Sequence, residues 1–123
     1  MKQWRDAIIN RDADMVQTLD RAFASDPHPF IPALMNSAQS DPEERVRSFS
    51  TRVLGRLRPP GTVDLMRKLL TDRSEYVRFN AAWALGELSD REVAPRLRRL
   101  RERDPSPDVR RSASDSLRKL EGG

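Results

Sequence analysis

The side chains that most often carry catalysis or bind metals are scarce in this sequence. The chain has one histidine, His28, inside the proline-flanked segment 25–30, and it has no cysteine. A zinc site would therefore have to use carboxylates alone, which is unusual. There is no glycine-rich phosphate loop, and Gly55 and Gly86 each stand between leucines, where close helix contact is the simplest role. We therefore expect no catalytic residue, no metal and no cofactor.

Residues 76–88, YVRFNAAWALGEL, suit binding better than catalysis. An apolar stripe with helical spacing consists of Val77, Ala81, Ala84, Leu85 and Leu88. At about 100° per residue, Tyr76, Phe79 and Trp83 fall roughly opposite this stripe. Large aromatic rings on the side away from the core predict either a binding surface or contact with a neighbouring helix.

Arginine is a third conspicuous residue type, with most of the basic excess in the second half of the chain. The sequence contains 23 lysines and arginines against 19 acidic residues, and its net charge is +4. The run RLRRLRER at residues 96–103 resembles a nucleic-acid-binding patch, although four acidic residues lie close to it. A solvated outer helix face is the other interpretation, and a phosphate-binding patch would lose affinity steeply with added salt.

The totals are typical of one helical domain. The chain has 123 residues, 37% hydrophobic and 34% charged, and no run approaches the ~18 consecutive apolar residues of a membrane span. The N-terminal sequence lacks the apolar stretch of a signal peptide. We expect a cytoplasmic protein without membrane contacts, and the sequence does not predict its oligomeric state.

The chain repeats itself three times. An aspartate precedes a Val-Arg pair by the same interval at Asp41–Arg47, Asp72–Arg78 and Asp104–Arg110, with spacings of 31 and 32 residues between repeats. A Leu-x-x-Leu pattern follows each pair, at residues 54–57, 85–88 and 117–120. Three aligned copies predict a helical repeat protein.

Each repeat reads as two helices joined by a tight turn. The first helices lie near residues 30–38, 63–70 and 93–100, and Pro32 and Pro95 fall where a first helical turn tolerates proline. We place the repeats at 28–57, 61–88 and 90–121, and a divergent capping pair at 1–25. The predicted apolar side of that pair comprises Trp4, Ile8, Met15, Val16, Leu19 and Phe23. A polar end face for the last helix is suggested by Ser112, Ser114, Asp115, Ser116 and Lys119.

These residues resemble the HEAT repeats, in particular the short bacterial and archaeal type that is called PBS-lyase HEAT-like. The resemblance covers residues 28–121, and it is more specific for fold than for function. It implies an all-α, right-handed α-solenoid of stacked antiparallel helix pairs, with about three full repeats plus the N-terminal pair in a single domain, 1–123. First helices would line the convex side and second helices the concave side.

The resemblance also implies a role for the repeated aspartates and arginines. Asp41, Asp72 and Asp104 would cap the second helices, and they would pair with the arginines of neighbouring repeats. Those arginines are Arg47, Arg78 and Arg110. An exposed ion pair of this kind is worth ~0.2–1 kcal/mol, so we expect the ladder to set stacking geometry more than stability.

The leading functional hypothesis is a non-enzymatic module that binds a protein or peptide on its concave face. The proposed binding residues are Tyr76, Phe79, Trp83, Arg52, Arg56 and Arg111, a set that favours an acidic partner. The other interpretation is that Phe49 and these aromatics pack together between helices.

Two further function classes stay open. Some HEAT-like DNA glycosylases bind DNA in a concave groove, and Trp83, Arg52 and Asp115 imitate part of their side-chain set. The family label alone suggests an accessory role in pigment attachment.

Overall fold

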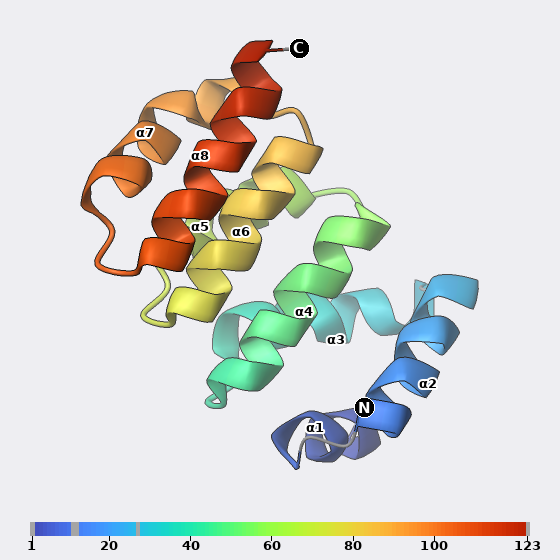
Figure 1. The fold of residues 1–123 in the computed structure, drawn as a ribbon. Helices are drawn as coiled ribbons and strands as arrows, with labels where there is room; N and C mark the ends of the chain where they lie inside the picture. Colours follow the sequence, from blue (N-terminus) through green and yellow to red (C-terminus); the bar gives the residue numbers. More distant parts are fainter. Residues whose placement is uncertain (1, 11–12, 27, 123) are drawn as a thin grey trace.

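The computed structural model describes residues 2–10, 13–26 and 28–122, and all of its regular elements are helices within these ranges (Figure 1). Helices α1 (Lys2–Ile9) and α2 (Ala13–Ser25) come first. Three helix pairs follow: α3 (Ile31–Ser40) with α4 (Glu44–Leu57), α5 (Thr62–Leu69) with α6 (Glu75–Glu87), and α7 (Ala94–Arg103) with α8 (Pro107–Gly122). Short 3-10 turns, η1 (His28–Phe30) and η2 (Arg91–Val93), lead into α3 and α7.

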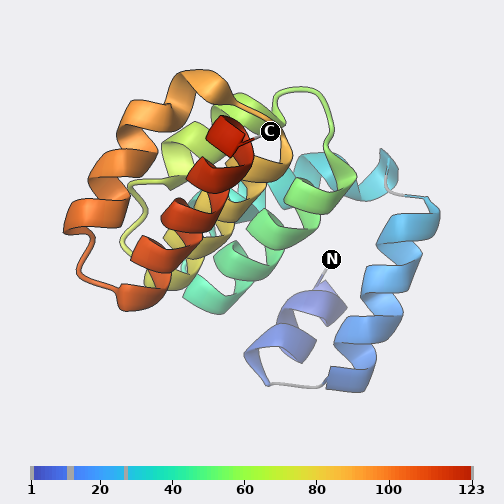
Figure 2. The same cartoon turned by 45° about the horizontal axis from the view of Figure 1, so that its top comes forward.

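The three pairs stack as an α-solenoid. Within each pair the two helices pack together, and the second helices α4, α6 and α8 pack side by side in one row. Both views show this row in front of α3 and α5, with α7 beside α8 at the outer edge of the stack (Figures 1 and 2). The core between the two layers includes the repeated valines Val46, Val77 and Val109, each fully buried. Pro32 and Pro95 lie in the first turns of α3 and α7, as predicted.

Neighbouring second helices approach closely because each contact has a glycine on one side. A Cβ atom on Gly55 would lie 2.8 Å from Cζ3 of Trp83, and one on Gly86 would lie 2.5 Å from Oγ of Ser116. The close contact predicted for both glycines is therefore confirmed. In the α6–α8 contact the hydroxyl of Ser116 donates to the carbonyl of Ala82 at 2.6 Å, and Ser112 donates to Phe79 at 2.8 Å.

The predicted polar end face of α8 is wrong for Ser112 and Ser116, whereas Asp115 and Lys119 are exposed. Ser112 and Ser116 are 5% and 3% exposed, and they point toward α6. A serine hydroxyl is small enough for a close helix contact, and it satisfies its own hydrogen-bonding need on the neighbouring backbone.

The repeats are also joined by what we call the arginine–aspartate ladder. Nε and Nη2 of Arg47 donate to the carboxylate of Asp72, both at 3.2 Å. The same atoms of Arg78 donate to Asp104 at 2.9 and 3.2 Å. The Nη1 group of each arginine donates to the aspartate carbonyl of its own repeat. For Arg110, the bond to the carbonyl of Asp104 at 2.7 Å is the one hydrogen bond of its side chain within the described residues.

Two expectations about the ladder need correction. The side chains of Arg47 and Asp72 are only 3% and 10% exposed, so the pair is buried and solvent screens it far less than an exposed pair. The aspartates also do not occupy the N-cap positions. Asp72 accepts from the N–H of Ser74, and Ser74 is the N-cap residue of α6, where its hydroxyl accepts from Tyr76. The aspartate therefore fixes the turn that precedes the helix.

The N-terminal pair stacks in an unexpected order. A further repeat of the same kind would place its second helix, α2, beside α4, but α1 packs against α4 instead. The pair lies at the α4 end of the row (Figure 2). Arg5 of α1 donates Nε and Nη2 to Asp41 at 2.6 and 3.1 Å, which extends the ladder by one step. Trp4 and Ile8 are buried as predicted, whereas the side chains of Met15, Leu19 and Phe23 lie outside the described part.

The added ladder step shifts the ionisation of both groups. Burial alone would raise the pKa of the Asp41 carboxyl, but hydrogen bonds from Arg5 and from the N–H of Glu43, with the charges of Arg5 and Arg47, lower it overall. The hydrogen bond and charge of Asp41 raise the pKa of Arg5 in return. The lowered pKa means that Asp41 keeps its negative charge to a lower pH than an ordinary aspartate does.

Candidate interaction surface

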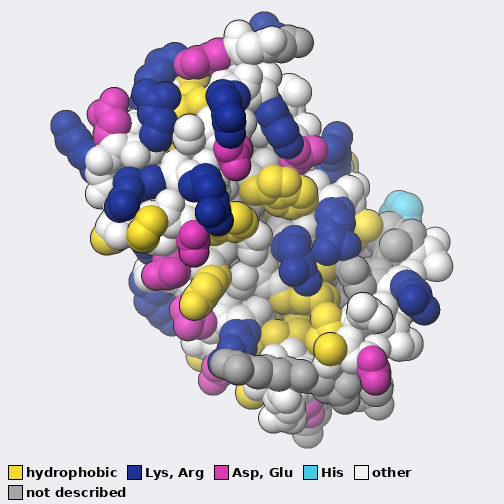
Figure 3. Space-filling view, in the orientation of Figure 1, with side chains coloured by type: hydrophobic (Ala, Val, Ile, Leu, Met, Phe, Trp, Pro, Cys, Tyr) yellow, Lys and Arg dark blue, Asp and Glu magenta, His cyan; other side chains and the backbone are white. Residues whose placement is uncertain are grey.

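The exposed side of the row α4, α6 and α8 carries the aromatic residues that the sequence singles out. Tyr76 is 56% exposed, and Phe79 and Trp83 are half-buried. In Figure 3 this face shows hydrophobic side chains running between groups of arginine and lysine side chains. The aromatic residues are therefore accessible from solvent along one continuous face.

Trp83 combines a packing contact with an accessible surface. Its six-membered ring lies against Gly55 of α4, where a Cβ atom would be only 2.8 Å away. The same side chain lines two cavities on the outer face. The indole is thus held by one helix while part of it stays open, which combines the two interpretations that the sequence allows.

Phe49 does not join the other aromatics as the packing interpretation expects. Its ring centroid lies 5.7 Å from that of Trp4 in α1, and the guanidinium carbon of Arg52 lies 5.6 Å from the Phe49 centroid. Phe49 is 6% exposed. The inverted position of α1 draws this ring away from α6 and toward the N-terminal pair.

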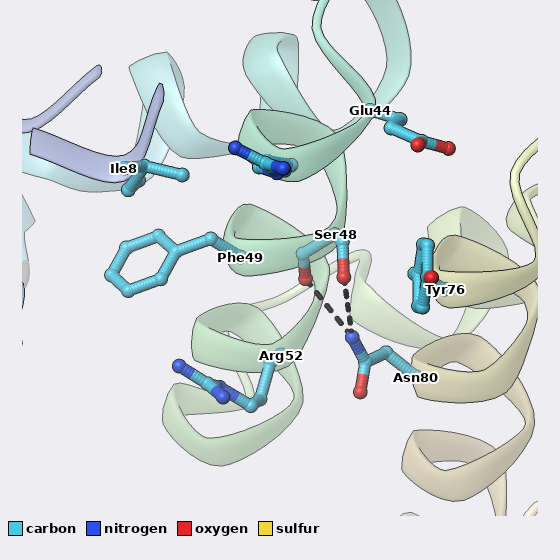
Figure 4. A pocket seen from close by; sticks show the side chains of 8 residues that line it. Ile8, Glu44, Ser48, Phe49, Arg52, Tyr76 and Asn80 are labelled. Atoms are coloured by element: carbon cyan, nitrogen blue, oxygen red, sulfur yellow. Dashed lines mark hydrogen bonds between the residues drawn. The ribbon is translucent and has the colours of Figure 1, made fainter. Parts of the chain in front are cut away.

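A cavity of about 450 Å³ lies where α1, α4 and α6 meet (Figure 4). Ile8 and Phe49 form one apolar wall, and Tyr76 with Asn80 forms the opposite side. Its remaining lining consists of Glu44, Arg45, Ser48 and Arg52. The side-chain amide of Asn80 donates to the hydroxyl and the carbonyl of Ser48 at 2.9 and 3.2 Å, so its nitrogen is used in holding α6 against α4.

Two further cavities continue the first one along the row. A cavity of about 300 Å³ is lined by Arg52, Arg56, Phe79, Asn80 and Trp83. The next, of about 550 Å³, is lined by Trp83, Asp115, Arg118 and Lys119. Arg52 and Asn80 line the first two cavities, and Trp83 lines the last two. We call this connected surface the α4–α6–α8 groove.

The groove gathers five of the six residues that the sequence proposes for binding. Tyr76, Phe79, Trp83, Arg52 and Arg56 line it. Arg111 does not line these three cavities and donates to Asp108 at 3.2 Å on its own helix. Sequence reasoning missed Ile8 and Asn80, and it assigned Phe49 to inter-helix packing alone. Trp4-Arg5 mirrors the repeated Val-Arg pair, and this signal could have placed α1, with Ile8, beside α4.

Positive charge prevails along the groove. The cationic lining residues are Arg45, Arg52, Arg56, Arg118 and Lys119, and the anionic ones are Glu44 and Asp115. At the α8 end, Arg118 pairs with Asp115, and Lys119 pairs with Glu87. The net excess of cations makes the groove complementary to a negatively charged surface.

The comparison with protein families agrees with the repeat pattern and the helix stack. The family model described as HEAT repeats matches residues 31–118. The chain belongs to the HEAT-repeat family. HEAT repeats are commonly scaffolds for protein interactions, and the family is generally non-enzymatic. The match covers α3 to most of α8, while α1 and α2 lie outside it.

No curated protein matches this HEAT-repeat chain. The PBS-lyase-like subtype therefore stays a prediction, as does any link to pigment attachment.

None of the described helices is both long enough and apolar enough to cross a membrane. Among the described residues, no group of three or more histidines, aspartates or glutamates lies together in a way that would hold a metal ion.

Proposed function

We propose that this HEAT-repeat protein is a non-enzymatic scaffold that binds an acidic segment of a partner protein in the α4–α6–α8 groove. The observation that carries the proposal is the row of three neighbouring cavities, in which adjacent cavities share lining residues between Ile8 at one end and Lys119 at the other. A continuous groove suits an extended chain segment better than a small ligand, because successive side chains of the segment enter successive cavities.

The composition of the groove supports a protein partner. Trp, Tyr and Arg are the residue types that dominate binding energy at protein interfaces. Tyr76 is exposed, and Trp83 is partly fixed by its contact with Gly55. Rings that are already held in place lose little conformational freedom when a partner covers them. Bulky apolar residues of the partner are expected in the cavity between Ile8 and Tyr76.

The charge of the groove supports an acidic segment. Five cationic and two anionic side chains line the three cavities. Such an excess speeds encounter with a negatively charged partner and makes association sensitive to salt. Acidic residues of the segment are expected near Arg52 and Arg56, and an apolar residue beside them would reach Phe49 or Tyr76.

A selection from a random peptide library on the immobilised protein tests the proposal. Enriched peptides should combine acidic residues with a bulky apolar residue. Tyr76→Ala and Arg56→Gln should each lower the affinity for these peptides by about tenfold. Arg101→Gln removes one charge from the opposite layer and serves as the control, with less than about twofold change. The proposal fails if enriched peptides bind the Tyr76 and Arg56 variants as well as the wild type.

Nucleic acid is the second ligand class. Trp83 lines one cavity together with Arg52 and the next cavity together with Asp115. Titration with single-stranded and duplex DNA at two salt concentrations separates the classes. Binding to DNA that falls steeply with salt, and that Trp83→Ala abolishes, would favour the nucleic-acid function over the peptide.

A further inference from the structure

Helix α7, in the layer opposite the groove, carries arginines that the proposed function does not use. Two of its arginines have carboxylate neighbours: Arg98 lies 2.6 Å from Glu121, and Arg101 lies 3.9 Å from Glu102. Within the part of the chain that the structure describes, the guanidinium groups of Arg96, Arg99 and Arg103 make no hydrogen bond or ion pair. Their spacing of three and four residues places them on one face of the helix.

These same three arginines line one cavity of about 320 Å³ between α5 and α7. The turn after α5 supplies Leu70 and Thr71, and α7 supplies Leu100. Asp104 also lines the cavity, but its carboxylate already accepts from Nε and Nη2 of Arg78 and from the N–H of Ser106. The arginines without partners thus coincide with a cavity whose one carboxylate is neutralised by another residue.

The chemistry of this arrangement selects an anion. Three like charges around one cavity repel one another, and an anion of higher charge relieves that repulsion more than a carboxylate does. The fork of N–H groups on arginine matches phosphate oxygens in bidentate geometry. A phosphate monoester carries about −1.5 to −2 charges at neutral pH, which suits three guanidiniums better than a single carboxylate charge does.

The size of the cavity and its apolar part limit the class of ligand further. Its volume lies at the lower end of the range for small-molecule sites, about 300–1,000 Å³. Leu100 is half-buried and lines the cavity, so it offers apolar contact beside the arginines, whereas Leu70 is 2% exposed and adds little accessible surface. Arg96 and Arg103 are seven residues apart, or about 10 Å along the helix axis, which is short for a groove that tracks a nucleic-acid strand.

We propose that the cavity between α5 and α7 binds a phosphate monoester, whose phosphate is held by Arg96, Arg99 and Arg103 and whose organic group contacts Leu100. This site is independent of the α4–α6–α8 groove. It lies in the layer of first helices, where α5 is behind the row of second helices and α7 is beside α8 (Figure 1).

Calorimetric titration of the full chain with phenyl phosphate, inorganic phosphate and benzoate tests the proposal. Phenyl phosphate should bind most tightly, because inorganic phosphate lacks the apolar group and benzoate lacks the second charge. Arg99→Gln and Arg103→Gln should each weaken phenyl phosphate binding by about tenfold. Both side chains are exposed, so we expect their melting temperatures to equal that of the wild type.

Arg101→Gln is the matched control, because it removes the same charge from the same helix outside the cavity, and it should change the affinity by less than about twofold. Tyr76→Ala should leave phenyl phosphate binding unchanged, which separates this site from the groove. The proposal is overturned if benzoate binds as tightly as phenyl phosphate, or if Arg101→Gln weakens binding as much as Arg99→Gln. Saturable binding of single-stranded DNA without binding of phenyl phosphate would also overturn it, in favour of a nucleic-acid surface.

Discussion

Replacing Gly86 by alanine tests the contact that holds the last two second helices together. The added Cβ atom would lie 2.5 Å from Oγ, 2.8 Å from Cβ and 3.0 Å from Cα of Ser116. Rotating the serine side chain moves Oγ but leaves Cβ and Cα in place. Helices α6 and α8 must therefore separate slightly, which stretches the 2.6 Å hydrogen bond from Ser116 to the carbonyl of Ala82.

Two opposing effects decide whether Gly86→Ala raises or lowers the free energy of unfolding. Alanine in a helix interior is worth about 0.5–1 kcal/mol more than glycine, which favours the variant. Overpacking costs about 1–3 kcal/mol, and weakening one buried hydrogen bond costs about 1 kcal/mol. We expect Gly86→Ala to lower the free energy of unfolding by about 1–3 kcal/mol. For a chain of this length the melting temperature should fall by about 4–12 °C.

Thermal unfolding followed by circular dichroism measures this change. Gly122→Ala is the matched control, because a Cβ atom there meets nothing within 4 Å, and its melting temperature should change little. The cost of Gly86→Ala should be smaller in a Ser116→Ala background, since the closest contact is then absent. If Gly86→Ala melts at or above the wild-type temperature while the control is neutral, the close approach of α6 and α8 is incorrect.

Three further predictions concern the ladder and the exposed ring. Asp72→Ala leaves the buried Arg47 without its carboxylate and should lower the free energy of unfolding in urea by about 3 kcal/mol, whereas Asp108→Ala at an exposed pair should change it by less than about 0.5 kcal/mol. The pKa of Asp41 is lowered in the folded chain, so its stabilising contribution is present at neutral pH and is lost as the pH falls through that folded pKa. The stability advantage of the wild type over Asp41→Asn should accordingly shrink in urea titrations below about pH 4. Tyr76→Ala should change the melting temperature by less than about 2 °C, because the side chain is 56% exposed and few contacts are lost.

The parts of the fold that repeat were predictable from the sequence. Equivalent positions in the three repeats have the same packing environment. A valine or leucine that recurs at such a position with helical spacing therefore indicates a buried residue. Val46, Val77 and Val109 are all fully buried. Gly55 and Gly86 also recur at the same position of their repeats, and each lies against the next second helix.

The parts that occur once were harder to predict. Trp4-Arg5 stands where the repeats have Val-Arg, but the preceding aspartate is absent, and α2 separates α1 from α3. Pattern matching therefore ranks the N-terminal pair as an ordinary divergent repeat. The position of α1 depends on a hydrogen-bonded pair between Arg5 and Asp41, 36 residues apart, and on the contact of Trp4 with Phe49.

The spacing of the repeated residues also does not predict that the arginine–aspartate ladder is buried. A pattern shows that an arginine and an aspartate recur, but their exposure depends on how closely the turns of neighbouring repeats approach. Arg47 satisfies its Nη1 group on the carbonyls of Asp41 and Pro42 at 2.9 and 3.3 Å, and its other nitrogens on Asp72. With each of its three nitrogens hydrogen-bonded, the guanidinium tolerates burial at a lower cost than an isolated charge would.

The same contacts explain why the groove is formed before a partner arrives. Asn80 joins α6 to α4 through Ser48, and Ser116 joins α8 to α6 through Ala82, so the three helices that line the groove are linked by directional bonds close to its surface. A groove that is already ordered requires little loss of conformational freedom on binding. Affinity is then limited by the complementarity of the partner to Tyr76, Trp83 and the surrounding arginines rather than by the cost of rearranging the helices.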